Sequence, residues 1–398
     1  MGVNNSQFIT TKASAPKIDF SAASASYIDG LITNLQKGKF AEYWTFAESM
    51  MRRDLRLQGE FAKRNRAIVT DFEVVVVGES SAKERKAAKA VTEIIKGIDN
   101  FEDAQMDLNS AFYYSLIALE FNDGNGNAWV NEDGIWKPAG FTYLEGWKMG
   151  SPAPEQSEYA KITPMLLDKD GNFIPFEENK WIVHIHRTIG GNPFAGGLAT
   201  SLIWTFLLKW FPLKDWVGLL EQYGIPKLIA SYNASLDPTN ERDIKTIAAI
   251  NLALQDVARI GSGAIPNDVT LTTIAPGSVN YEAFQKLVEY ADNSYSIAIN
   301  GGMMTSIAAA NGLGSGAADV QNEVRKEIIE TDHRQLESTF SKQLVTPIIR
   351  LNFPEIPIGK KFRFQYLKSE DKQVASTTNK AKRVTATTSE MGGENTVK

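Results

Sequence analysis

The 398-residue chain contains no cysteine, which excludes disulfide bonds, thiolate nucleophiles and cysteine-based zinc sites. It also lacks an apolar run long enough for a membrane span, which takes roughly 20 predominantly apolar residues. Uncharged residues continue from Gly190 to Leu208, but the first of them have Gly, Asn and Pro turn chemistry, and Lys209 and Pro212 interrupt the rest. We therefore expect no membrane-spanning helix.

Positive charge is not in excess either. The formal net charge is −5 and the isoelectric point is about 5.5. Proteins that bind nucleic acid through its phosphates usually carry a basic face or stripe. We therefore expect any contact with duplex DNA to be weak and independent of sequence.

Catalytic motifs are missing as well. The spacing Gly191-x-x-x-x-Gly196 resembles the start of a phosphate loop, but Gly197 and Leu198 stand where that loop needs a lysine and a hydroxyl residue. The run "GLGSG" at 312–316 lacks both the last glycine and the preceding strand of a dinucleotide fingerprint. No G-x-S-x-G nucleophile motif is found. The sequence predicts a protein that is not an enzyme, and a phosphate-binding enzyme that uses these glycine-rich loops is the less favoured alternative.

Two of the three histidines could in principle hold a metal. His184 and His186 stand two residues apart on an expected strand and therefore face the same side, with Asp332 or His333 as distant candidates for further ligands. The spacing indicates no third ligand. We interpret them as histidines on a strand surface and expect no metal and no cofactor.

Hydrophobic periodicity gives an outline of the first half. Residues 1–24 read as a polar arm, and Asp-Gly and Asn-Gly turns within 117–186 predict hairpins of an antiparallel sheet. The turn "DKDGN" at 168–172 is expected to be a hairpin turn, since it lacks the later ligands of a calcium loop. The other expected elements are helices at 27–35, 40–58 and 81–98 and a strand at 72–77.

The second half begins with an apolar helix at about 199–223, which carries large side chains on nearly every face and must be covered, we expect by other subunits. A β-α-β segment, a helix ending near Asn300 and a glycine-rich loop at 301–316 follow. A single long helix is then predicted from Ala317 to about Leu351, and the tail beyond Leu367 is expected to be disordered. The apolar stripe of the long helix contains Val320, Val324, Ile328, Leu336, Phe340 and Leu344.

The order of these segments resembles the portal proteins of Mu-like bacteriophages over about 54–353. Three segments carry the resemblance, and the middle one is the most specific, with an apolar helix after "GNPFAGG" and then aromatic-Gly-x-Pro before a strand. The segments are "DLRLQGEFAKRNRAIVTDFEV", "KWIVHIHRTIGGNPFAGGLATSLIWTFLLKWFPLKDWVGLLEQYGIPKLIASY" and "NGGMMTSIAAANGLGSGAADVQNEVRKEIIETDHRQLESTFSKQLVTPIIRLNF".

The resemblance implies an α+β portal fold with wing, stem and clip domains and a reduced crown, because the chain is short past Phe353. It implies a dodecameric ring at one capsid vertex of the virion, assembled in the host cytoplasm. The implied partners are the terminase large subunit, neck or tail adaptor proteins, the major capsid protein and double-stranded DNA passing through the channel. By position, the wing would span 25–196 with the long helix 317–353, the stem helices 197–223 and 279–300, the clip 224–278, the tunnel loop 301–316 and a short C-terminal segment 354–398.

The resemblance also implies two sets of site residues. The tunnel loop carries no charge, and glycine lets a loop change conformation at little steric cost. The DNA-channel residues would be Gly301, Gly302, Met303, Met304, Asn311, Gly312 and Gly314, and those of the oligomer interface Trp204, Trp210, Phe211, Trp216 and Leu220. Another structural protein of the virion head or neck is the remaining alternative, and a closed ring in solution would distinguish a portal from an enzyme.

Overall fold

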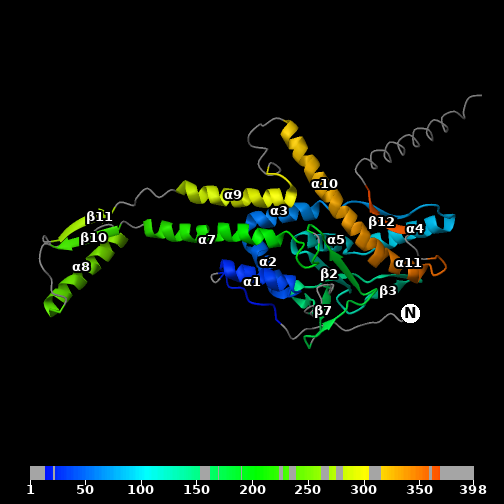
Figure 1. Cartoon of the computed structure of the whole chain (residues 1–398), viewed down its shortest axis with the longest axis horizontal. Helices are drawn as coiled ribbons and strands as arrows, with labels where there is room; N and C mark the ends of the chain where they lie inside the picture. Colours follow the sequence, from blue (N-terminus) through cyan, green and yellow to red (C-terminus); the bar gives the residue numbers. More distant parts are fainter. Residues whose placement is uncertain are drawn as a thin grey trace, which may run out of the picture. The chain divides into compact units, whose positions relative to one another are not determined.

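The structure, a computed structural model, divides the chain into two compact units (Figure 1). Unit 1 comprises Met1–Ile203 and Tyr295–Lys398, and unit 2 comprises Trp204–Ser294. The residues described are 14–20, 23–152, 162–168, 170–189, 191–223, 227–232, 239–260, 269–274, 281–303, 315–357 and 361–367. The expected tail beyond 367 and most of the N-terminal arm lie outside these ranges.

Unit 1 combines helices with small antiparallel sheets, which confirms the α+β class. The sequence sets several helix starts. Ser24 caps the first helix, and Ser81 and Glu84 form a reciprocal capping box at the fourth. The helices are α1 (Ala25–Gln36), α2 (Ala41–Arg53), α3 (Leu55–Arg66), α4 (Ala82–Lys96), α5 (Phe101–Asn109), α6 (Ala111–Tyr114), α10 (Ser315–Phe340) and α11 (Thr346–Asn352).

The described strands of unit 1 form four separate sheets, in the orders β1-β12, β5-β2-β9, β3-β4 and β6-β7-β8. The expected hairpins are present at β3-β4 and β7-β8, but the Asp-Gly and Asn-Gly turn at 123–126 joins β2 and β3, which belong to different sheets. The Asp168 carboxylate accepts the N–H groups of Asp170 and Asn172 in the turn between β7 and β8. The strands are β1 (Phe72–Val76), β2 (Leu116–Phe121), β3 (Trp129–Glu132), β4 (Ile135–Pro138), β5 (Phe141–Tyr143), β6 (Met149–Gly150), β7 (Met165–Leu167), β8 (Phe173–Ile174), β9 (Trp181–Ile185) and β12 (Phe362–Tyr366).

An aromatic cluster in the core of unit 1 joins segments that lie far apart in the sequence. Phe72 of β1 stacks on Phe364 of β12 with ring centroids 4.7 Å apart. Phe340 of α10 lies 4.9 Å from Phe364 and 5.3 Å from Phe101 of α5. Burial of such rings is a large favourable term, since each aromatic side chain removes about 150–250 Å² from water. The C-terminal strand, which the sequence analysis missed, is therefore part of the core.

The helix expected over 40–58 is two helices that meet at Asp54. Asp54 has extended backbone angles (φ −109°, ψ 107°), and its carboxylate accepts the N–H groups of Arg56 and Leu57 at 3.0 and 3.1 Å. An aspartate side chain that satisfies the free N–H groups of the next turn favours a helix start at that point. The single-helix prediction was wrong because it overlooked this cap.

The long helix expected from Ala317 to Leu351 is also interrupted. Residues Ser341–Val345 form a π-helical segment between α10 and α11. Pro347 then occupies the first turn of α11, where a missing N–H costs little. The C-terminal part of the predicted apolar stripe is buried, but Val320 and Val324 in its N-terminal part are exposed.

Unit 2 contains the elements expected between the two long helices. An antiparallel pair, β10 (Lys227–Tyr232) and β11 (Val269–Ile274), encloses α8 (Glu241–Ile260) in the chain. The unit also contains most of α7 (Ala199–Tyr223) and α9 (Tyr281–Asn300). Lys209 of α7 pairs with Asp292 of α9 at 2.6 Å. In the parts of the chain that the structure describes, no helix combines the length and apolarity that a membrane span requires.

The segment "GNPFAGG" packs closely against the backbone of residues 113–115. A Cβ atom added to Gly197 would lie 2.3 Å from the carbonyl oxygen of Tyr113 and 2.5 Å from the nitrogen of Ser115. The Ser115 hydroxyl accepts the N–H of Gly196 at 2.9 Å and donates to the carbonyl of Pro193 at 2.7 Å. These glycines are required for close approach of two backbone segments.

We predict that Gly197→Ala destabilises the protein by at least about 3 kcal/mol, because backbone atoms cannot move aside as a flexible side chain can. Chemical denaturation measures this loss. The matched control is Gly30→Ala in α1, where nothing lies within 4 Å of the added carbon, and a gain of about 0.5–1 kcal/mol is expected. If the Gly197→Ala protein were as stable as wild type, the close backbone packing at Gly197 would not be required.

Candidate functional site

Three large side chains on one face of α7 are incompletely covered. Trp204 and Leu208 are each 43% exposed, and Phe211 is partly exposed. Their spacing of i, i+4 and i+7 places them on a single stripe, which we call the α7 outer face. An apolar stripe of this kind is the pattern of a helix that packs against another element.

The other predicted interface residues have different surroundings. Trp210 stacks on Phe206 within α7, with centroids 5.7 Å apart. Trp216 stacks on Phe284 of α9 at 6.0 Å. The side chain of Leu220 lies outside the described part. Sequence reasoning overlooked Leu208 and the 57% exposed Val217, because periodicity does not separate covered from uncovered faces in a helix that is apolar all round.

The first residues of the predicted tunnel loop pack against α10. Gly301 ends α9 with φ +76°, and an added Cβ would lie 2.7 Å from the Val324 side chain. Gly302 is buried, and its added Cβ would meet Gln321 at 2.7 Å. Met303 is 40% exposed. The remaining predicted channel residues, Met304, Asn311, Gly312 and Gly314, lie outside the described residues.

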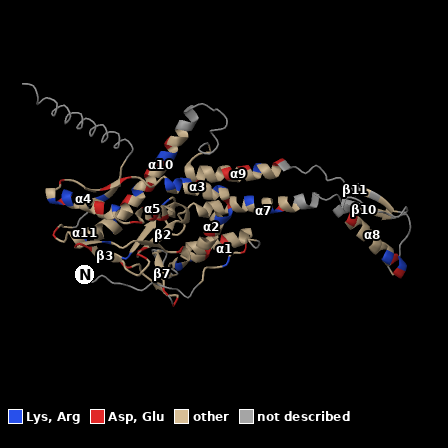
Figure 2. Ribbon diagram, turned by 180° about the vertical axis from the view of Figure 1, so that it is seen from behind, with Lys and Arg blue, Asp and Glu red and all other residues tan. Residues whose placement is uncertain are grey.

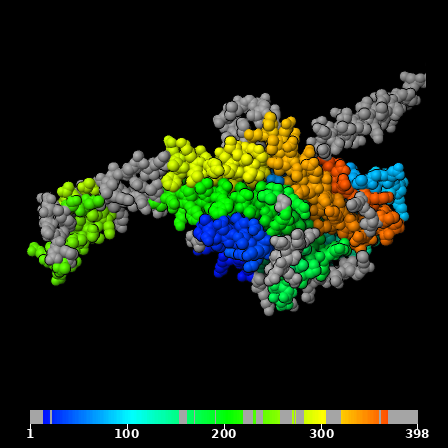
Figure 3. Space-filling view, viewed as in Figure 1, coloured from blue at the N-terminus to red at the C-terminus, as the bar shows by residue number. Residues whose placement is uncertain are grey.

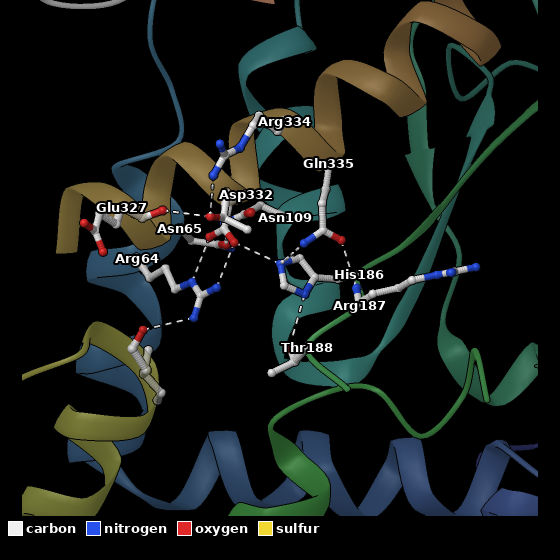
Figure 4. A network of polar contacts seen from close by, with 12 residues as sticks. Arg64, Asn65, Asn109, His186, Arg187, Thr188, Glu327, Asp332, Arg334 and Gln335 are labelled. Atoms are coloured by element: carbon white, nitrogen blue, oxygen red, sulfur yellow. Dashed lines mark hydrogen bonds and ion pairs between the residues drawn. The ribbon is translucent and has the colours of Figure 1, made fainter. Parts of the chain in front are cut away.

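A buried ion pair connects α3 with the helices on either side of that loop (Figure 4). The Arg64 guanidinium donates two hydrogen bonds of 2.8 Å to the Asp332 carboxylate of α10. It donates a third, of 3.0 Å, to the carbonyl of Ile299 in the last turn of α9. A bidentate arginine–carboxylate pair fixes both distance and orientation. One side chain therefore joins the last turn of α9 to the second half of α10.

A second contact from α3 fixes the end of α9. The Asn300 amide donates to the Glu60 carboxylate at 2.8 Å and to the Glu60 carbonyl at 3.1 Å. Arg56 and Lys63 each approach the same buried carboxylate at 3.1 Å. Together with Arg64 and Asp332, Glu60 and Asn300 form what we call the anchor network.

His186 connects the anchor network to the end of β9. Its Nε2 lies 2.9 Å from an Asp332 oxygen, and its Nδ1 lies 3.2 Å from the Thr188 hydroxyl. Burial acts to raise the pKa of the Asp332 carboxyl, but the hydrogen bonds from His186 and Arg64 outweigh it and hold the pKa below its ordinary value. Asp332 is therefore ionised at neutral pH and acts as the acceptor of the network.

The histidines are not on a strand surface, which corrects the sequence analysis. His184 is 1% exposed and His186 is 4% exposed, because α10 covers that side of β9. The His184 Nδ1 lies 2.8 Å from the Thr339 hydroxyl of α10. Among the described residues, no three or more His, Asp or Glu side chains are grouped so as to hold a metal ion. The geometry indicates structural histidines.

Sequence comparison assigns the class of protein as a phage portal protein. A family model described as the portal protein of Mu bacteriophage matches residues 44–392, which is most of the chain. The chain belongs to this family, and the resemblance found in the sequence analysis is confirmed. Portal proteins are structural, so the assignment supports the prediction that the chain is not an enzyme.

Two curated relatives agree with the assignment. The portal protein of Escherichia phage Mu is 26% identical over 326 residues, which cover 81% of this chain and 60% of the relative. A Mu-like prophage FluMu protein, gp29 of Haemophilus influenzae, is 25% identical over 344 residues, which cover 84% of this chain and 62% of the relative. The chain thus spans about 60% of the length of these relatives.

Solved structures show weaker likenesses. A chain of the virion of a native gene transfer agent particle has a TM-score of 0.49 and 11% identity, with 88% of this chain and 91% of that chain covered. An HK97 family phage portal protein from Corynebacterium diphtheriae has a TM-score of 0.41 and 12% identity, with 80% and 94% covered. The family assignment rests on the sequence match.

We predict that Arg64→Leu costs about 3–5 kcal/mol of unfolding free energy, because it leaves the Asp332 carboxylate buried and without its charge partner. Chemical denaturation measures the loss. Arg52→Ala is the control, since the Arg52–Glu48 pair is a surface pair with 75% of the arginine side chain exposed, and it should cost less than about 1 kcal/mol. Similar losses in both variants would contradict the role assigned to Arg64.

The protein is expected to lose stability on mild acidification. Burial, and next the neighbouring His186, lower the pKa of His184 from its ordinary value of 6.5 to about 3. A group with a lowered folded-state pKa binds more protons when unfolded, so its contribution is complete above pH 6.5 and is lost as the pH falls toward 3. Burial also lowers the pKa of His333, in the same direction.

The test is the unfolding free energy of wild type and His184→Gln at pH about 7.5 and about 5. The variant removes one titrating group, so the loss of stability between the two pH values should be smaller than in wild type. An identical loss in both proteins would show that His184 does not contribute.

Proposed function

We propose that the protein forms a closed, dodecameric ring at one capsid vertex and serves as the conduit for DNA during packaging and ejection. Membership in the Mu portal family supports this function. The observation that carries it is the α7 outer face, a stripe of large apolar side chains that the subunit itself leaves partly open to water. In a ring, a neighbouring subunit covers such a stripe through a head-to-tail contact.

The proposal extends to location and partners. The ring is part of the virion and is assembled in the host cytoplasm. The terminase large subunit docks during packaging, neck or tail adaptor proteins dock afterwards, and the major capsid protein surrounds the vertex. In this reading α7 and α9 are the stem helices, and α8 with β10 and β11 is the clip.

The 301–316 segment is proposed as the channel loop that faces the DNA. Its sequence contains no charged residue, so it cannot bind phosphates as ion pairs. The anchor network supports this assignment, because it binds to α3 both the end of α9, directly before the segment, and Asp332 in the second half of α10, after it.

We predict that the double variant Trp204→Glu with Leu208→Glu moves the protein from rings toward monomers or aggregates. Two carboxylates cannot be buried against an apolar neighbour without a large desolvation cost. Size-exclusion chromatography and negative-stain images measure the ring fraction. Lys245→Glu in α8 is the control, since this side chain is 75% exposed. An unchanged ring fraction in the double variant would contradict the interface.

Deletion of residues 308–314 tests the channel loop. We expect the shortened protein to assemble rings normally, because the anchor network and the α7 outer face are untouched. DNA packaging or retention in the filled head should fall. If particles that carry the deletion package full-length genomes at normal yield, the segment is a connector and its assignment to the channel wall is wrong.

A further inference from the structure

Cations predominate on one face of α4, although the chain as a whole is net acidic. Lys86, Lys89 and Lys96 of α4 stand at i, i+3 and i+10, so they share the side turned away from the buried Ala87, Val91 and Ile95. Arg85 lies at the rim of this side, and all four side chains are exposed. We call these four residues the basic face of α4. Figure 3 shows α4, in light blue, at the surface beside β12.

Nearby carboxylates neutralise this face only at Lys96. Glu84 pairs with Lys361 at 2.9 Å, and its pKa is lowered to about 2, first by the backbone N–H of Ser81, so it remains ionised and engaged. Glu355 pairs with Lys83 at 3.3 Å. Glu93, 3.6 Å from Lys96, is the acidic side chain on the face itself. Among the described residues, no carboxylate lies within ion-pair distance of Lys86 or Lys89. Figure 2 colours the ribbon of α4 blue at its lysine and arginine positions.

We infer that the basic face of α4 is a contact surface for the phosphate backbone of duplex DNA. The charges span about 15 Å along the helix, at a rise of about 1.5 Å per residue. A DNA strand presents one phosphate per about 3.4 Å of axis, so several phosphates lie within reach of the face. Lysine acts as a point charge with rotatable donors and needs no fixed geometry. The contact is therefore weak and independent of sequence.

This inference rests on the proposed function for the choice of DNA as the partner. It also refines the expectation of weak DNA binding, because it locates the contact outside the uncharged loop. A portal subunit would then bind packaged or passing DNA at its basic face while the channel loop stays free of ion pairs. An acidic protein surface is the competing partner, and the experiment separates the two.

The experiment measures binding of a duplex of random sequence to assembled rings at several salt concentrations. Lys86→Glu with Lys89→Glu should weaken binding and reduce the slope of log K against log salt by about two, at about 0.9 per lost phosphate contact. The control is Lys245→Glu with Lys286→Glu, which changes the net charge equally at two side chains that are each 75% exposed. Circular dichroism and thermal melting verify that the variants fold, and negative-stain images verify the rings.

A loss of affinity and slope confined to the α4 variant supports the inference. Equal losses of DNA affinity in both double variants would mean an effect of net charge and would overturn the inference. The absence of any DNA binding by the wild-type protein at low salt would overturn it as well. Tighter binding of polyglutamate than of DNA at the same salt assigns the face to an acidic protein and also overturns it. In each of these cases the proposed conduit function is unaffected as long as the protein forms rings. If the wild-type protein forms no rings, the proposed function itself is contradicted.

Discussion

The fold of unit 1 depends on how its strand edges are satisfied. Sheets of two or three strands leave a third to a half of their backbone N–H and C=O groups without a neighbouring strand, and buried groups of this kind are costly. The helical segment from α10 to α11 provides the missing partners with side chains. The Gln343 amide accepts from Val183 N–H and donates to its carbonyl, both at 2.8 Å. Asn352 makes the same paired contact with Trp136, at 2.7 and 2.8 Å.

The same segment also serves the strand that completes the core. The Ser341 hydroxyl accepts the N–H of Phe364, and the Glu337 carboxylate accepts that of Tyr366, each at 2.9 Å. On the other edge of this sheet the Thr92 hydroxyl accepts the N–H of Val74. Polar side chains from helices thus replace strands in three sheets. This explains why the segment carries half-buried amide and hydroxyl side chains where it meets β4, β9 and β12.

Sequence reasoning recovered the features that depend on neighbouring residues. Periodicity gave the helices and hairpins, and the order of segments gave the family. It missed features that need partners distant in the chain. The pairing of β1 with β12 and the burial of His184 and His186 both depend on segments far along the sequence. The two-residue spacing of the histidines correctly placed them on one side of β9, but nothing local shows that α10 covers that side. Asp54 is a different case, because its capping role was readable and was overlooked.

The π-helical segment Ser341–Val345 determines in which direction the side chains of α11 point relative to those of α10. An α-helix turns by about 100° per residue, and one extra residue in a π turn resets which directions the following side chains take. Upstream of Ser341–Val345, polar side chains face β9 and β12, and downstream Asn352 faces β4. A single-residue insertion or deletion in this segment would therefore rotate α11 by about 100° about the helix axis relative to α10. The contacts of α10 with β9 and β12 would remain, whereas Asn352 of α11 would no longer face β4.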